Sequence, residues 1–126
     1  MSLAAEQYLA ACAAAQLGEV APALEGSYSG GTAATVGALL VLAVQDLAAR
    51  PAREAAEAER LRSIYDAAVD AGIAVPEPRD LAGLRAGLEN LHGAAETAGE
   101  DRLCRRILHH YVETAKAAKL ELPALA

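Results

Sequence analysis

Alanine makes up about a quarter of the 126 residues and occurs along almost the whole chain. It loses no side-chain entropy when a helix forms, which makes it the strongest helix former. The chain has no Phe and no Trp, so leucine, valine and alanine must fill the core between closely packed helices. We therefore predict an all-α protein with a single domain over residues 1–126, since this length buries a core without metal or disulfide.

Charge and hydrophobicity exclude several classes of protein. The formal net charge is −6, whereas a nucleic-acid-binding surface is expected to be basic, so we predict no nucleic-acid partner. The 54% hydrophobic content is too high for a disordered chain. Two cysteines and an N-terminus without a basic start favour a reduced, cytoplasmic protein. The longest apolar stretch, residues 33–44, is short of the ~20 residues that cross a bilayer, so we predict no membrane partner.

Prolines and glycines divide the chain into helices. Pro51 has no amide hydrogen and its ring clashes with the preceding turn, so we expect it to break or sharply kink the second helix. Gly26, Gly72 and Gly99 are expected stops. The expected helices cover residues 4–24, 29 or 32 to 50 with a second half at 52–71, 81–98 and 100–119. Short turns between them predict an up-and-down four-helix bundle.

Apolar residues recur at steps of three and four in these helices, which predicts their inward faces. The helix over residues 29–50 is apolar nearly all round, so we expect it to be the most buried. The expected faces are Leu9, Cys12, Gln16, Val20 and Leu24; then Ala58, Leu61, Tyr65 and Ala68; then Leu81, Leu84, Leu88, Leu91 and Ala95; and finally Cys104, Ile107, Leu108, Tyr111, Ala115 and Ala118. The two cysteines are accordingly expected to be small core residues rather than nucleophiles.

The apolar helix over residues 29–50, the leucine face of the helix at 81–98 and the tail at residues 120–126 together present a large apolar surface. It is more than thin alanine-rich helices are expected to bury within one subunit. An exposed apolar patch of more than a few hundred Å² normally marks an interface. We therefore predict a twofold homodimer, with Leu122 and Leu125 of the tail in its interface.

Positive charge is concentrated in the last helix of an otherwise acidic chain. This cationic patch consists of Arg102, Arg105, Arg106, His109 and His110. It could bind a phosphate, a CoA-type ligand or an acidic protein surface. The alternative, which we favour, is that its arginines pair with glutamates of the helix at 52–71, namely Glu54, Glu57 and Glu59.

A second candidate site uses the ExxH spacing of Glu89 and His92, which places a carboxylate and an imidazole on one side of a helix. His109 and Glu113 would complete a small metal site. A di-iron bundle needs two such pairs and further carboxylates, so we interpret these four residues as solvated side chains and predict no cofactor. The segment Gly26–Thr32 has the glycine spacing of a phosphate loop but lacks its lysine, so we interpret it as a turn.

Several strings resemble a family of small uncharacterised bacterial helical proteins, namely GEVAPALEG, TAATVGALLVLAVQDLAARPAREAAEAERLRSIY, DLAGL and LCRRILHHYVETAKAAKLELP. Members of that family are often encoded beside aminoglycoside-phosphotransferase-like kinases and acyl-CoA dehydrogenases. The resemblance implies an accessory role near acyl-CoA or phosphotransfer metabolism and brings no catalytic residues.

No complete catalytic constellation occurs in the sequence. We therefore predict a non-enzymatic accessory or protein-interaction bundle with a further protein partner. The alternative is a bundle that binds a small molecule or a metal.

Overall fold

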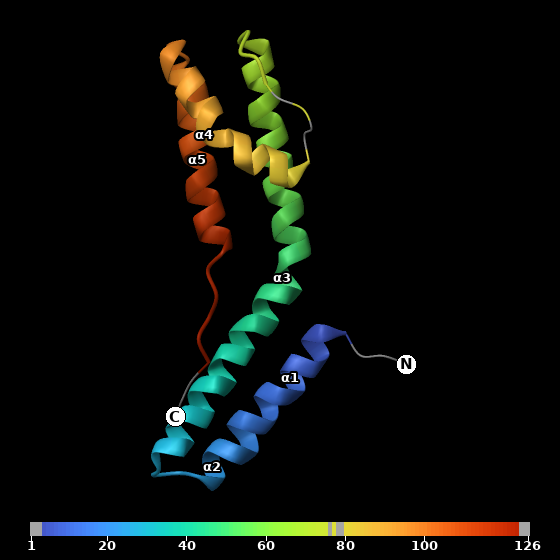
Figure 1. Cartoon of the computed structure of the whole chain (residues 1–126), viewed down its shortest axis with the longest axis vertical. Coiled ribbons are helices and arrows are strands. Elements are labelled where there is room, and N and C mark those ends of the chain that lie inside the picture. The colour runs from blue at the N-terminus through green and yellow to red at the C-terminus, as the bar shows by residue number, and fades with distance from the viewer. Residues whose placement is uncertain (1–3, 76, 78–79, 124–126) are drawn as a thin grey trace. The chain divides into compact units, whose positions relative to one another are not determined.

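The computed structural model describes residues 4–75, 77 and 80–123, and these residues are 82% helix with no strand. The all-α prediction is confirmed. In chain order the elements are α1 (Ala5–Ala15), the π-helix η1 (Gln16–Val20), α2 (Ala21–Ala23), α3 (Tyr28–Asp70), α4 (Leu81–Thr97) and α5 (Asp101–Ala117), as Figure 1 shows.

The chain divides into two compact units. Unit 1 comprises Met1–Pro51 together with Leu120–Ala126, and unit 2 is the continuous stretch Ala52–Lys119. Each unit is described by itself below.

The expected break at Pro51 is absent, because α3 is a single helix of 43 residues with Pro51 inside it. A proline removes only one backbone hydrogen bond, and the alanines on both sides of it are strong helix formers. An ion pair between Asp46 and Arg50, four residues apart, supports the preceding turn. Pro51 nevertheless marks the boundary between the two units.

In unit 1, α1 lies alongside the first half of α3 (Figure 1), and the turn at residues 24–27 connects α2 to α3. Gly26 has φ +81°, which favours glycine, and Ser27 rather than Ser29 or Thr32 caps α3 by accepting a hydrogen bond from the Gly30 amide at 3.1 Å. Gly37 lets the helices approach closely, because a Cβ there would lie 2.6 Å from Leu17 Cγ.

The expected inward face of the first helix is wrong in part. Ala13 is buried and Leu9 is half-buried, but Cys12, Val20 and Leu24 are exposed. The wider turn of η1 shifts the angular position of every residue that follows Ala15, which accounts for Val20 and Leu24. Cys12 precedes η1 and is exposed because the neighbouring Ala13 faces inward instead.

The first half of α3 is not the most buried helix. Ala33 and Ala38 are buried, but Val36 and Leu39 are exposed, because α1 covers only one of its faces. By length and composition alone, α3 is also long and apolar enough to cross a membrane. Its most apolar 18-residue window has a mean hydropathy of 1.7, and 17% of that window is buried.

Unit 2 contains the main hydrophobic core, formed by the second half of α3 with α4 and α5. Its fully buried members are Leu61, Ile64, Tyr65, Ala68, Leu84, Leu88, Leu91, Ala95, Leu103 and Ile107. This confirms the predicted faces of both α3 in this unit and α4. The Tyr65 hydroxyl donates a hydrogen bond to the Leu84 carbonyl at 2.9 Å, and burial raises the pKa of the Tyr65 hydroxyl. Asp80 caps α4 by accepting a hydrogen bond from the Gly83 amide at 2.8 Å.

The predicted inward face of α5 is confirmed at Ile107 and is otherwise wrong by about one residue. Leu103, Ile107 and His110 are buried, whereas Leu108 and Tyr111 are about half exposed. A shift of one position turns a helix by about 100°, so the Leu103 face replaces the predicted Cys104 face. Among the other expected members, Cys104 is half-buried and Ala115 and Ala118 are exposed.

The tail belongs to unit 1. The Gln45 side chain donates a hydrogen bond to the Glu121 carbonyl at 2.8 Å and accepts one from the Glu121 amide at 2.9 Å. Leu122 is 75% exposed, and Leu125 lies outside the described residues.

Candidate functional site

A groove of about 830 Å³ runs between the second half of α3 and α5, entirely within unit 2. On the α5 side it is lined by the whole predicted cationic patch, namely Arg102, Arg105, Arg106, His109 and His110. Successive members are three or one positions apart, which keeps them on one side of α5, so they form one stripe that extends about 12 Å along the helix.

The α3 side of the groove contributes a fourth guanidinium group, that of Arg60. Its other lining residues are Ala56, Glu59, Ser63 and Ile64. The order of contacts shows that the two helix segments are antiparallel, because Arg106 contacts Ser63 while His110, one turn further along α5, contacts Arg60. The groove is therefore rich in arginine on both walls. Glu59 is its single carboxylate among the lining residues.

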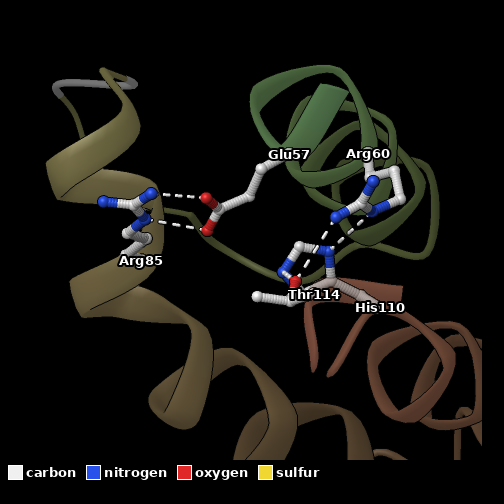
Figure 2. Close-up of polar contacts among 5 residues, drawn as sticks. All are labelled: Glu57, Arg60, Arg85, His110 and Thr114. Atoms are coloured by element: carbon white, nitrogen blue, oxygen red, sulfur yellow. Dashed lines mark hydrogen bonds and ion pairs between the residues drawn. The ribbon is translucent and has the colours of Figure 1, made fainter. Parts of the chain in front are cut away.

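Arg60 is held in position from α5 (Figure 2). Its Nε donates to Nδ1 of His110 at 3.4 Å, and its Nη2 donates to Oγ1 of Thr114 at 3.3 Å. The same threonine oxygen lies 3.4 Å from Nε2 of His110. Both nitrogens of the imidazole thus face polar partners, and Arg60 bridges the two helices at one end of the groove.

His110 is only 3% exposed, which is deeper burial than histidine usually has. Burial and the neighbouring Arg60 charge both lower its pKa, and the nearby Glu57 carboxylate opposes this effect. A neutral imidazole can accept the hydrogen bond from Arg60, whereas an imidazolium cannot. The lowered pKa therefore favours the form of His110 that orients Arg60.

Glu57 of α3 pairs with Arg85 of α4 and not with an arginine of the cationic patch. Its side chain is almost fully buried and forms a bidentate pair with Arg85, with Arg85 Nε to Glu57 Oε2 at 2.8 Å (Figure 2). The hydrogen bonds from Arg85 lower the pKa of the Glu57 carboxyl against the opposing effect of burial. This pair fixes α4 against α3.

The favoured pairing of the patch with three glutamates is wrong. In the part of the chain that the structure describes, no ion pair joins Arg102, Arg105 or Arg106 to Glu54, Glu57 or Glu59. Arg106 Nη2 instead donates to the Ser63 hydroxyl at 2.6 Å. Arg102 and Arg105 form neither an ion pair nor a side-chain hydrogen bond within residues 4–75, 77 and 80–123.

The structure does not gather the four residues of the alternative metal site into one cluster. His92 contacts Glu96, one turn further along α4, at 3.3 Å, and His109 contacts Glu113 at 3.8 Å. Among the described residues, no three His, Cys, Asp or Glu side chains group closely enough to hold a metal ion.

The cysteines differ from each other. Cys104 is half-buried against the core, and partial burial together with nearby Glu96 and Asp101 raises the pKa of its thiol. This fits the predicted role as a small core residue, because a raised pKa suppresses the reactive thiolate. Cys12 is exposed, so that prediction is wrong for it.

Sequence reasoning missed Arg60 and Thr114 as parts of the site. Arg60 lies between the inward residues of α3 and its charged face, and Thr114 lies four residues beyond His110. The signal for this contact is an arginine at the boundary of the buried face of α3 that meets two polar residues, one turn apart, on α5. It can be recognised only once the true inward face of α5 is known.

Comparison of the chain with protein-family models, curated proteins and solved structures finds no match.

Proposed function

We propose that this chain is a non-enzymatic accessory protein that binds an anionic ligand or partner in the groove between α3 and α5. The observation that carries the proposal is the set of four arginines that line the groove, two of which, Arg102 and Arg105, have neither an ion-pair nor a side-chain hydrogen-bond partner in the described residues. Because the whole chain is acidic, this local excess of positive charge would direct anions to the groove and away from the rest of the surface.

The size of the groove supports a small-molecule ligand. Small-molecule sites usually have volumes of roughly 300–1,000 Å³, and about 830 Å³ falls within that range. The inferred link to acyl-CoA or phosphotransfer metabolism, which rests on the family resemblance, agrees with an anionic ligand and stays a proposal.

The test is a titration of ¹⁵N-labelled protein with a dicarboxylate, a sulfate ester, a phosphate ester and an acidic peptide. We expect at least one of them to shift amide resonances confined to residues 56–64 and 102–110. The double variant Arg102→Ala/Arg105→Ala should abolish these shifts. Arg62→Ala, which removes an exposed arginine of α3 outside the groove, should preserve them. No shift with any probe would refute the proposal.

We also propose a homodimer, with four helices per subunit arranged as an up-and-down bundle. The support is an exposed apolar face of α5 next to the groove arginines, where Leu108, Tyr111 and Val112 are each about half exposed within little more than one helical turn. A twofold contact would cover the same face on both subunits. Its test is described in the Discussion.

The proposed location is the cytoplasm, without a membrane partner. The support is that the helix with the apolar window continues into a strongly charged second half that carries the core of unit 2. Flotation with liposomes of zwitterionic and anionic lipid is the test. Protein that stays at the bottom of the gradient agrees with the proposal, and co-flotation would assign the apolar window of α3 to a bilayer.

A further inference from the structure

We propose that the groove binds the phosphate group of a small organic phosphate, with Arg102 and Arg105 as the residues that hold the phosphate oxygens. This inference rests on the proposed function and names the ligand chemistry of the same groove.

The balance of charge in the groove favours phosphate over carboxylate. Four guanidinium groups line the groove against the single carboxylate of Glu59. A carboxylate has one charge and two oxygens, which one arginine fork satisfies. A phosphate ester carries about −1.5 to −2 charges and three acceptor oxygens, so it can engage two forks at once.

The four arginines differ in what they can still bind. Arg60 uses Nε and Nη2 on His110 and Thr114, and Arg106 uses Nη2 on Ser63, so both are held as fixed positive charges. Arg102 and Arg105 have no such partners within the described part of the chain. They are three residues apart on α5, which places their side chains on neighbouring positions of one face. These two arginines therefore supply the complete forks.

The rest of the groove fits the organic part of the ligand. A phosphate ion alone fills only a small part of about 830 Å³. Ile64 and Ala56 provide apolar wall, and the aliphatic stems of the arginines extend it. A molecule with a phosphate at one end and a flat or aliphatic body matches this combination.

The experiment is calorimetric titration at pH 7.5 and about 0.15 M ionic strength, where exposed charges are screened beyond ~8 Å. The probes are phenyl phosphate, inorganic phosphate and benzoate, which separate the phosphate group from the ring. We expect phenyl phosphate to bind more tightly than either of the others. Arg102→Ala and Arg105→Ala should each weaken its binding by about tenfold or more, which corresponds to one lost charge-assisted contact.

Two further variants separate specific contacts from general attraction. Arg102→Lys keeps the charge but loses the fork, so its affinity should fall between those of the unmodified protein and Arg102→Ala. Arg62→Ala should leave the affinity unchanged. All substituted side chains are exposed, and circular dichroism confirms that each variant is folded.

The possible outcomes distinguish this inference from the proposed function. Equal binding of benzoate and phenyl phosphate, with loss in Arg102→Ala, would overturn the phosphate inference and leave the groove as an anion site. No binding of the three calorimetric probes, when the acidic peptide still shifts the groove resonances, would do the same. An affinity that Arg62→Ala lowers as much as Arg102→Ala, or no binding of any probe, would overturn both.

Discussion

At the scale of single residues, His110 connects the stability of unit 2 to the geometry of the groove. It is buried, it accepts a hydrogen bond from Arg60, and its pKa is lowered by burial and by the Arg60 charge. Protonation would place a second positive charge beside Arg60 and remove the acceptor. A solution pH that protonates His110 therefore opposes both folding and the alignment of Arg60.

The first prediction concerns acid stability. Because the pKa of His110 is lower in the folded than in the unfolded protein, the unfolded state binds more protons below about pH 6.5, and the free energy of unfolding falls as the pH drops through that value. Chemical denaturation between pH 7.5 and 5 should show this loss. His110→Gln, which cannot titrate, should flatten the curve between these limits.

The control is His109→Gln, since the His109 side chain is largely exposed in the neighbouring position. This variant should keep the pH dependence of the unmodified protein. An identical pH dependence in His110→Gln would show that another group is responsible. Glu57 is separable from His110, because its pKa is lowered from 4.5 and its contribution is lost only at more acidic pH.

The second prediction concerns two adjacent glycines in unit 1. A Cβ at Gly30 would collide with the backbone carbonyl oxygen of Leu24, whereas a Cβ at Gly31 would meet nothing within 4 Å. Gly30→Ala should therefore lower the stability of the protein by about 1 kcal/mol or more, while Gly31→Ala should raise it by about 0.5–1 kcal/mol. Thermal unfolding of the matched pair measures both. Equal effects would mean that the turn at residues 24–27 adjusts to the added methyl group.

At the scale of elements, the orientation of each helix is set by which residues it buries. The prolines, glycines and caps of the sequence predicted α4 and the stops at Gly72 and Gly99 correctly. The rotation of α5 was not predictable in the same way. Its apolar residues occur on two faces, one that contains Leu103 and one that contains Leu108. Periodicity alone does not indicate that the Leu103 face is the buried one.

The α5 residues of the candidate site were therefore predicted from the sequence, whereas Arg60 of α3 and the contacts within the site were not. The arginines of α5 were visible as a charged patch, and the structure places all of them on one groove. Glu57 was expected to neutralise them, but Arg85 of α4, 28 residues away in sequence, pairs with it instead. Such a choice between competing cations depends on which helices pack together, and local spacing does not contain that information.

The third prediction tests the contact between α3 and α4. Arg85→Ala should lower the free energy of unfolding by about 1–2 kcal/mol, because it leaves the Glu57 carboxylate buried without its partner. This range is below that of a fully buried pair, since the Arg85 side chain is 47% exposed. Urea denaturation is the measurement.

Adding Glu57→Gln to Arg85→Ala should recover part of the loss, because the unpaired charge is removed. Arg62→Ala, on the exposed face of α3, is the control and should change the stability by less than about 0.5 kcal/mol. Additive losses in the double variant would exclude coupling between Glu57 and Arg85.

At the scale of the whole molecule, the fourth prediction is the homodimer. Light scattering at micromolar concentration should give twice the subunit mass of 12.9 kDa. Leu108→Ser/Val112→Ser should shift the mass toward one subunit, because these side chains are about half exposed on α5 and their apolar area is lost from the interface. A mass near 12.9 kDa that does not change on dilution would rule out the dimer.

The tail offers the matched comparison. Leu122→Ser/Leu125→Ser should leave the dimer intact if α5 forms the interface, and should dissociate it if the tail does. The two double variants therefore decide between the α5 face and the original expectation for residues 120–126.

The connectivity of the two units also sets an order of events during synthesis. Unit 2 is one uninterrupted stretch of the chain, so every contact of its core can form as soon as Lys119 has left the ribosome. Unit 1 begins earlier in the chain but is completed later. Its Gln45 side chain can form its hydrogen bond only after Glu121, which is 76 positions further along, has been synthesised. The apolar first half of α3 is therefore synthesised early. The C-terminal segment with Glu121, whose backbone binds Gln45 of that helix, is synthesised only after the whole of unit 2.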